Sequence, residues 1–353
     1  MTLSELRAKI DELDKKIVGL LNERARLVQE VGKVKAREGK PVYAPNREQE
    51  VYNKVAANNP GPLSNDCLRA VYRELMSGSF ALEKPLKVAY LGPEGTFTHV
   101  AARERFGSGV TYVPAKGIDA VFSDVATGRA DYGVVPIENS TEGGINDTLE
   151  MFIESDLRVC AEIILRIRHT LLANCRLEDV RRVCSKSQAL GQCRRWLGEH
   201  LPNAELKEVA STSEAARMAT CEPGTAAIAY AGAADLYGLK ILAQSIEDSP
   251  NNFTRFFVLS KTFGDHSGHD KTSIMCSIKD EVGALYGILL PFKHHGINLT
   301  KIESFPSKQK PWTYWFFIDF EGHCADKPVT QALEEVKTKC SEMKVLGSFP
   351  KAK

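Results

Sequence analysis

The feature that most constrains the fold is a long apolar stripe near the start of the chain. From Ser4, a candidate N-cap, Leu, Ile and Val recur at steps of three and four residues until Gly39 ends the pattern. At a rise of about 1.5 Å per residue, the predicted helix 4–38 is about 50 Å long. The two shorter helices predicted next, 46–57 and 64–82, are too small to cover it. An intertwined dimer is therefore predicted, because the helices of a partner would bury the stripe.

Composition argues against several classes of function. The chain has 353 residues, 43% of them hydrophobic, and a net charge of +1, which predicts a globular protein that binds no nucleic acid. No apolar run reaches the roughly 18 residues of a membrane span, and the N-terminus does not resemble a signal peptide. Nine cysteines without a Cys-x-x-Cys pair predict reduced thiols and a cytoplasmic location. His266 and His269 lie in a Gly-rich linker, so no metal site is predicted.

The periodicity changes twice after the helical segment, which predicts a multidomain chain. Residues 87–263 alternate short apolar strands with helices, a pattern typical of a mostly parallel sheet that binds ligands at its strand ends. The strands are predicted at 87–91, 132–137, 158–165, 168–173, 181–184, 226–229 and 255–260, with a helix at 98–106.

A linker at 264–270 leads into residues 271–353, whose order of elements predicts a ferredoxin-like α+β unit. Its strands are predicted at 272–278, 297–303, 313–320 and 345–349, and its helices at 283–294 and 328–341.

Charged residues of the helical segment gather on predicted faces. Arg24 and Lys35 share a face of the long helix, whereas Arg7 lies about 100° away and could serve the site of a partner. Ser79 and Glu83 are four residues apart on the third helix and also share a face. Cations, a hydroxyl and a carboxylate around one cavity would suit a small dianion. A solvated charged helix explains the same charges without a site.

The order of these residues resembles the all-helical chorismate mutases. The resemblance covers residues 3–83 and rests on Leu-Arg-x-x-Ile-Asp-x-Leu-Asp, Leu-Leu-x-x-Arg, Val-Gly-x-x-Lys and the Arg-Glu pair at 47 and 48. It implies that residues 1–84 form a domain that rearranges chorismate to prephenate. The chorismate-binding residues that it implies are Arg7 from the partner chain, Arg24, Lys35, Arg47, Glu48, Ser79 and Glu83. Arg24, Lys35 and Glu83 would be catalytic.

A second constellation opens the predicted strand near residue 255. Thr254 and Arg255 stand between Phe253 and Phe256 at the start of an apolar run. An unpaired charge near the interior costs several kcal/mol, so this arginine needs an anion or a carboxylate. A hydroxyl beside a cation suits an anionic substrate, although an arginine at an ordinary strand start explains the pair equally well.

Four segments of residues 87–263 resemble prephenate dehydratase. They are Tyr90–His99, Asp131–Ser140, Ser185–Cys193 and Asn252–Phe256. The family fold consists of two α/β lobes around a cleft, like a periplasmic binding protein, with the last strand returning to the first lobe. The resemblance implies loss of carbon dioxide and water from prephenate, which becomes phenylpyruvate.

The resemblance also implies roles for individual residues. Thr254 would serve the leaving hydroxyl, Arg255 would anchor a carboxylate, and Phe256 would wall the ring. The implied prephenate-binding residues are Thr96, Glu138, Asn139, Ser140, Thr141, Gly143, Ser185, Gln188, Thr254, Arg255 and Phe256. A threonine hydroxyl is a weak acid, so a neighbour must assist it, and the sequence does not choose between Glu138 and His169. Lys186 stands where histidine is usual in the family.

Residues 271–353 resemble the ACT domain, a module that binds amino acids at subunit interfaces. The segments Gly283–Tyr286 and Glu303–Pro306 carry the resemblance, with Asn298 and Leu299 before the second. It implies that L-phenylalanine binds there and inhibits the dehydratase in a homodimer or homotetramer. The implied regulatory residues are Gly283, Ala284, Leu285, Asn298, Leu299, Glu303 and Ser304.

The three resemblances together predict a bifunctional enzyme of L-phenylalanine biosynthesis, acting on chorismate and prephenate without a cofactor. Two alternatives stay open at this point. The middle domain could act on arogenate, in which an amino group replaces the keto group of prephenate. The chain could also be a sensor of aromatic metabolites that binds them without turnover.

Overall fold

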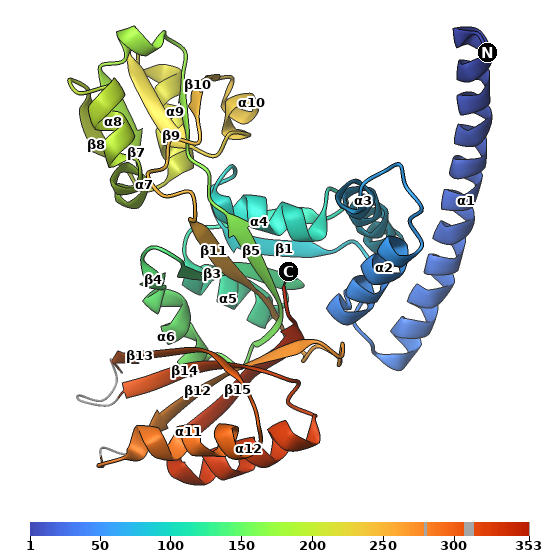
Figure 1. Cartoon of the computed structure of the whole chain (residues 1–353), viewed down its shortest axis with the longest axis vertical. Helices are drawn as coiled ribbons and strands as arrows, with labels where there is room; N and C mark the ends of the chain where they lie inside the picture. Colours follow the sequence, from blue (N-terminus) through green and yellow to red (C-terminus); the bar gives the residue numbers. More distant parts are fainter. Residues whose placement is uncertain (279–280, 307–313, 353) are drawn as a thin grey trace. The chain divides into compact units, whose positions relative to one another are not determined.

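The computed structural model describes residues 1–278, 281–306 and 314–352 (Figure 1). The chain divides into two compact units, a helical one and a larger one built on three sheets. The helical unit comprises residues 1–44, 50–86 and 106–111, and the larger unit comprises 45–49, 87–105 and 112–353. None of the helices in the described residues combines the length and the apolar character needed to cross a membrane.

Three helices form the N-terminal part, as predicted. They are α1 (Leu3–Glu38), α2 (Pro45–Ala57) and α3 (Asn65–Glu83). The expected N-cap at Ser4 is wrong by two residues. Thr2 caps α1 instead, because its hydroxyl accepts from the Glu5 amide while the Glu5 carboxylate accepts from the Thr2 amide. Gly39 ends α1 in the left-handed region, with φ +65°.

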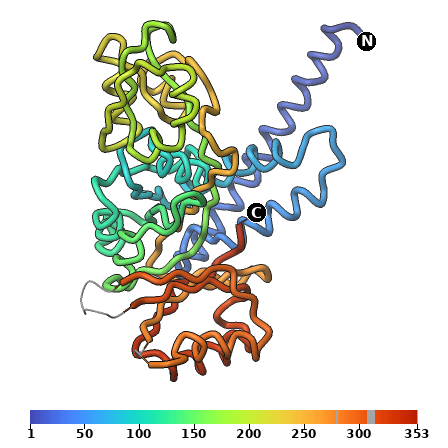
Figure 2. The backbone as a smooth tube through the Cα atoms, turned by 60° about the vertical axis from the view of Figure 1, so that its left-hand side comes forward, coloured from blue at the N-terminus to red at the C-terminus, as the bar shows by residue number. Residues whose placement is uncertain are grey.

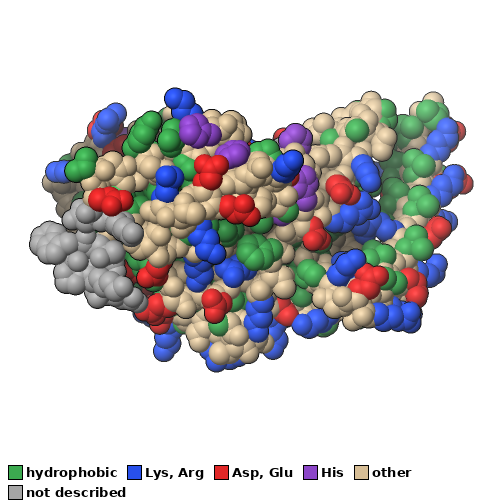
Figure 3. Space-filling view, turned by 90° about the horizontal axis from the view of Figure 1, so that it is seen from below, with side chains coloured by type: hydrophobic (Ala, Val, Ile, Leu, Met, Phe, Trp, Pro, Cys, Tyr) green, Lys and Arg blue, Asp and Glu red, His purple; other side chains and the backbone are tan. Residues whose placement is uncertain are grey.

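The apolar stripe of α1 lies on the surface of the single chain. No residue of α1 is buried, and Leu20 and Leu27 are 65% and 64% exposed. Hydrophobic side chains are visible along the right-hand edge of Figure 3, where α1 lies. Such a stripe needs a covering surface, so the predicted dimer keeps its physical basis and stays a prediction.

The first lobe of the larger unit is built on a mixed sheet with strand order β2-β1-β3-β11-β5, and β4 pairs with β3. Its strands are β1 (Lys87–Leu91), β2 (Thr111–Ala115), β3 (Tyr132–Asn139), β4 (Gly143–Gly144), β5 (Arg158–Arg166) and β11 (Phe253–Ser260). Its helices are α4 (Phe97–Phe106), α5 (Ile118–Thr127) and α6 (Asn146–Glu154).

The expectation of a mostly parallel sheet is wrong for this lobe. Strands β1 and β3 are parallel, but β11 lies between β3 and β5 and is antiparallel to both. The reason is topological. The chain leaves the lobe through β5, forms the second lobe, and returns through β11 in the opposite direction (Figure 1).

The second lobe carries a five-stranded sheet of order β10-β6-β9-β7-β8. Its strands are β6 (Thr170–Ala173), β7 (Arg182–Ser185), β8 (Glu205–Glu208), β9 (Thr225–Ala229) and β10 (Lys240–Gln244). Its helices are the 3₁₀ turn η1 (Leu177–Asp179), α7 (Ser187–Gln192), α8 (Arg194–His200), α9 (Thr212–Cys221) and α10 (Ala233–Tyr237). The two strands that the sequence did not predict here, β8 and β10, are the short edge strands of the sheet and are largely exposed.

The C-terminal part has the predicted ferredoxin-like fold. Its elements are β12 (Asp270–Ile278), α11 (Ala284–His294), β13 (Leu299–Pro306), β14 (Tyr314–Glu321), α12 (Lys327–Lys339) and β15 (Cys340–Pro350). The sheet has the order β13-β14-β12-β15 and is antiparallel throughout. Thr313, where the third strand was expected to begin, lies outside the described residues.

This C-terminal sheet is covered on both faces. Ile274 and Ile318 belong to the core beneath α11 and α12. On the other face, Phe317 and Phe349 share one hydrophobic core with Phe257 of β11. Figure 2 shows the C-terminal strands running directly beneath the first lobe. The back of the strand that carries Thr254 therefore packs on this sheet.

Candidate active sites

The helical unit brings four of the seven predicted chorismate-binding residues together. The guanidinium of Arg24 donates to the Ser79 hydroxyl at 3.1 Å, and the Lys35 ammonium lies 3.3 Å from the Glu83 carboxylate. Gly32 permits this approach, because a Cβ at that position would lie 2.9 Å from Cγ of Glu83. Two cations, a hydroxyl and a carboxylate thus line one side of the α1–α3 contact.

The remaining three residues lie elsewhere along the helices. Arg7 lies 17 residues before Arg24 on α1, which corresponds to about 25 Å along the axis. It cannot reach the Arg24 site of its own chain, so its predicted role in the site of a partner stays a prediction. Arg47 and Glu48 lie in the first turn of α2.

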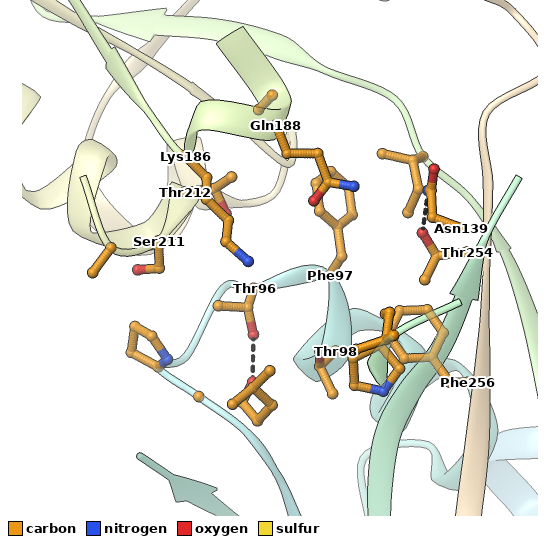
Figure 4. A pocket seen from close by; sticks show the side chains of 18 of the residues that line it. Thr96, Phe97, Thr98, Asn139, Lys186, Gln188, Ser211, Thr212, Thr254 and Phe256 are labelled. Carbon is orange, nitrogen blue, oxygen red and sulfur yellow. Dashed lines mark hydrogen bonds between the residues drawn. The ribbon is translucent and has the colours of Figure 1, made fainter. Parts of the chain in front are cut away.

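The larger unit contains a cavity of about 390 Å³ between its two lobes (Figure 4). The first lobe contributes Thr96, Asn139, Thr254 and Phe256 to the lining, and the second contributes Gln188 from α7. These are five of the eleven residues predicted to bind prephenate. They come from four separate segments of the chain, which the fold brings to one cavity.

The side chains of Thr254 and Asn139 are hydrogen bonded to each other in this cavity. The amide nitrogen Nδ2 of Asn139 lies 2.8 Å from Oγ1 of Thr254 (Figure 4). The backbone N–H of Thr141 donates to Oδ1 of Asn139 at 3.0 Å, which fixes the orientation of the amide. Asn139 is therefore the donor, and the hydroxyl proton of Thr254 stays available for a group in the cavity. Among the neighbours of Thr254, Asn139 is thus the one that donates a side-chain hydrogen bond to its hydroxyl oxygen.

The two neighbours considered from sequence have other contacts. Glu138 does not line the cavity, and its carboxylate pairs with Lys301 at 3.0 Å. His169 lines the cavity and is hydrogen bonded through Nε2 to Gln192 at 2.8 Å. Oε1 of Gln192 also accepts from Asn252, so His169 donates from Nε2. Burial lowers the pKa of His169 below its usual value, which favours the neutral ring.

The prediction that Arg255 anchors a substrate carboxylate in this cavity is wrong. Adjacent residues of a strand point to opposite faces, and Thr254 and Phe256 take the cavity face. Arg255 is buried on the other face, where Nε donates to Glu162 at 2.7 Å and Nη1 donates to Asp319 of the C-terminal sheet. The arginine does find carboxylates, but they belong to the protein.

Four further residues predicted to bind prephenate have structural contacts instead, and none of them lines the cavity. The buried Ser185 hydroxyl donates to the carbonyl of Ile228. The hydroxyl of Ser140 is bonded to the backbone at the start of β11. The hydroxyl of Thr141 donates to the Oδ1 atom of Asn139. Gly143 pairs with Asn139 in the ladder between β3 and β4. Ser140, Thr141 and Gly143 thus support the site from its rim.

Sequence reasoning assigned no role to several polar residues of the cavity. Lys116 and Lys186 line it, as do Ser211 and Thr212 at the start of α9. The ammonium group of Lys186 points into the space between the lobes (Figure 4). The family difference at Lys186 was a usable signal, because a cation replaces the usual histidine there. Lys116 stands in no recognised segment, so only the fold brings it to the cavity.

The predicted regulatory residues lie at two places in the C-terminal part. Gly283, with φ +84°, begins α11 together with Ala284 and Leu285. Asn298 lies just before β13, which contains Leu299, Glu303 and Ser304. The Glu303 carboxylate accepts from the backbone N–H of Gly144 at 3.1 Å and pairs with Lys301 at 2.8 Å. A residue predicted to bind the effector, Glu303, is therefore hydrogen bonded to the backbone at the rim of the cavity.

Comparisons with known proteins agree with this architecture. Family models match at residues 6–84 (chorismate mutase type II), 88–263 (prephenate dehydratase) and 272–338 (ACT domain). The bifunctional chorismate mutase/prephenate dehydratase of Aquifex aeolicus is 48% identical over 99% of this chain and 98% of its own. That of Pseudomonas aeruginosa is 46% identical over the same shares.

Among solved structures, prephenate dehydratase from Arthrobacter aurescens in complex with L-Phe is 35% identical. The structural match covers 76% of this chain and 90% of the Arthrobacter chain, with a TM-score of 0.71.

Proposed function

The chain belongs to the family of bifunctional chorismate mutase/prephenate dehydratases, and from this premise we propose how its residues carry out the two reactions. The helical unit converts chorismate to prephenate. The cavity between the two lobes converts prephenate to phenylpyruvate, carbon dioxide and water, in the biosynthesis of L-phenylalanine.

In the first reaction, the ether C–O bond of chorismate breaks while a C–C bond forms, and no group is transferred to the protein. Arg24 and Lys35 bind the folded conformer and donate to the ether oxygen as negative charge grows on it. The contacts of these cations with Ser79 and Glu83 support the assignment, because they direct both cations toward α3 before substrate binds. Membership of the family supports three further chorismate contacts, namely Arg47 and Glu48 of α2 and Arg7 of a partner chain.

In the second reaction, the bond between the ring and its carboxylate breaks, and its electron pair moves into the ring and expels the hydroxyl. Thr254 donates a hydrogen bond to that hydroxyl, which takes up one proton and leaves as water. Solvent resupplies this proton to the site. The single observation that carries this role is the bond from Asn139 to Thr254. Because Asn139 donates, it orients the threonine proton into the cavity and stabilises charge on its oxygen.

The substrate carries two carboxylates, and with Arg255 excluded they need other cations. Lys116 and Lys186 line the cavity from opposite lobes, which supports a role for each with one carboxylate. The start of α9, with Ser211 and Thr212, adds the positive end of a helix dipole. Phe256 walls the ring, with Thr96 and Gln188 as polar contacts.

One assay tests the whole proposal, namely formation of phenylpyruvate from chorismate by the full-length chain. Thr254→Ala is expected to abolish dehydration and let prephenate accumulate, because the mutase site is separate. Thr254→Ser, which keeps the hydroxyl, is the matched control and retains part of the activity. Undiminished phenylpyruvate formation by Thr254→Ala would refute the role of Thr254. Comparing the turnover of arogenate with that of prephenate tests which of the two is the substrate of the dehydratase site.

The same family membership supports a cytoplasmic enzyme that assembles through α1 and responds to L-phenylalanine. The nine cysteines are free, as expected in a reducing compartment. Ile10 and Ile17 are 56% and 51% exposed on the stripe of α1, so a partner is needed to cover them. Ile17→Glu is expected to reduce the oligomer mass in sedimentation. L-phenylalanine is expected to lower dehydratase activity and to raise the melting temperature.

A further inference from the structure

Four polar side chains form a closed ring of hydrogen bonds at the edge of the dehydratase cavity. Gln192 donates from Nε2 to the Thr141 hydroxyl at 3.0 Å, and that hydroxyl donates to Oδ1 of Asn139 at 2.6 Å. Asn139 donates from Nδ2 to Oδ1 of Asn252 at 2.9 Å, and Asn252 donates from Nδ2 to Oε1 of Gln192, also at 2.9 Å. Every bond therefore runs in the same direction around the ring.

Two groups that can play only one role fix this direction. The backbone N–H of Thr141 can only donate, and it donates to Oδ1 of Asn139 at 3.0 Å. An ionised carboxylate can only accept, and that of Glu142 accepts from Nε2 of Gln192 at 3.0 Å. Hydrogen bonds that follow one another head to tail polarise each other. The loss of one member therefore weakens the rest of the ring.

The ring joins the two lobes of the larger unit. Asn139 ends β3 of the first lobe, and Thr141 lies two residues further along, at the rim of the cavity. Asn252 is 1% exposed and lies just before β11, where the chain returns to the first lobe. Gln192 is the member that the second lobe contributes, because it ends α7.

The side chain of Gln192 has no hydrogen-bonding capacity left for a substrate. Its two N–H groups donate to Thr141 and Glu142. Its oxygen accepts from Asn252 and, at 2.8 Å, from Nε2 of His169. A primary amide offers two donors and two lone pairs, and all four are used here. Although Gln192 lines the cavity, its bonds therefore serve the protein.

We propose that Gln192 is a positioning residue of the dehydratase site, which aims Asn139 at Thr254 through this ring. The inference rests on the proposed role of Thr254. The amide nitrogen of Asn139 donates to Oγ1 of Thr254 at 2.8 Å (Figure 4). Rotation of that amide would turn its N–H groups away from Thr254, and the ring holds it at both its oxygen and its nitrogen. A side chain of the second lobe thus orients the proton donor of the first.

The test measures Gln192→Glu and Glu142→Gln, singly and together, in the full-length chain. Gln192→Glu keeps the size and the acceptor atoms of the side chain but cannot donate to Thr141. We expect kcat for dehydration to fall about ten-fold with KM within about two-fold of the parent, because a slightly misaligned catalytic group slows the reaction steeply. Glu142→Gln is the matched control. It lies outside the ring, and its amide oxygen still accepts from Gln192, so kcat is expected to be unchanged.

The double variant separates positioning from folding. Gln192→Glu alone puts two carboxylates side by side, whereas in the double variant the amide at 142 donates to the carboxylate at 192. We expect the melting temperature to recover and kcat to stay low, because Thr141 still receives no hydrogen bond. Recovery of kcat together with the melting temperature would make Gln192 merely structural and overturn the inference.

Thr141→Val interrupts the same ring from the first lobe while the backbone N–H bond to Asn139 remains. A similar loss of kcat is expected, and combination with Gln192→Glu should add little, because both break one path. Fully additive losses would overturn the inference. If Gln192→Glu does not fold, as judged by mutase turnover and melting temperature, an unchanged kcat in Thr141→Val overturns it instead.

Two further outcomes distinguish this inference from its premise. An increased KM with an unchanged kcat in Gln192→Glu would make Gln192 a substrate contact and overturn the positioning role. An active Thr254→Ala variant would refute the proposed function itself. An inactive Thr254→Ala variant beside a fully active Gln192→Glu variant would overturn the inference alone.

Discussion

Replacing Asn139 by aspartate tests the central feature of the dehydratase site with almost no change in side-chain shape. The carboxylate keeps an oxygen for the Thr141 amide but loses the two N–H groups of Asn139. Those N–H groups donate to the Thr254 hydroxyl at 2.8 Å and to the side-chain amide oxygen Oδ1 of Asn252 at 2.9 Å. The introduced carboxylate would accept the threonine proton instead of donating to the oxygen, which reverses the direction of this hydrogen bond.

The size of the effect follows from these contacts. A positioned proton donor contributes roughly 10²–10⁴-fold to rate, so kcat for dehydration is expected to fall at least about 100-fold, or about 2.7 kcal/mol in activation free energy. The amide oxygen of Asn252 also loses a buried donor, which costs about 1–3 kcal/mol of stability. A domain of ordinary stability tolerates that loss and stays folded.

The assay is phenylpyruvate formation from prephenate, with mutase turnover of the same sample as an internal count of folded protein. Asn251→Asp is the control, because it makes the same chemical change at an exposed neighbouring position outside the cavity. A kcat for Asn139→Asp within about three-fold of the parent would refute the reasoning, since a donor to Thr254 would then be irrelevant.

Three further perturbations follow from close contacts and burial. Gly32→Ala would put a Cβ 2.9 Å from Cγ of Glu83, so mutase kcat is expected to fall about ten-fold while dehydration is unchanged. Gly144→Ala would displace the Glu303 carboxylate, and we expect altered inhibition by L-phenylalanine in dose–response assays with mutase turnover unaffected. Burial lowers the pKa of His169 from 6.5, so the unfolded state binds the proton more readily below that pH. The free energy of unfolding is therefore expected to fall as pH decreases below about 6.5, and less steeply in His169→Gln, as urea titrations would measure.

Most of the fold could be predicted because the spacing of apolar residues follows the period of each helix or strand over long stretches. The 3.6-residue stripe of α1 and the apolar strands β1, β3 and β9 are visible in sequence and present in the structure. The strands that were missed, such as β8 with its sequence Glu-Leu-Lys-Glu, are largely exposed and short. Edge strands owe their form to the neighbour that pairs with them, so their own residues carry little signal.

The candidate sites were predictable in outline and less so in detail. The contacts of Arg24 and Lys35 with α3 follow from which residues share a helix face. The cavity was harder, because its lining comes from loops and strand ends far apart in sequence. Lys116, for example, has no local feature that distinguishes it from other surface lysines, and only the packing of the two lobes makes it line the same cavity as Lys186.

The pair at 254 and 255 separates what each level of structure decided. The sequence by itself determined that a threonine and an arginine open an apolar strand, and that the arginine needs an anion or a carboxylate near the interior. It could not say which face meets the cavity, because neither face of β11 is open to solvent: one lines the cavity and the other packs on the C-terminal sheet. Only the tertiary structure, by packing that sheet behind β11, assigned Thr254 to the substrate side and Arg255 to Asp319.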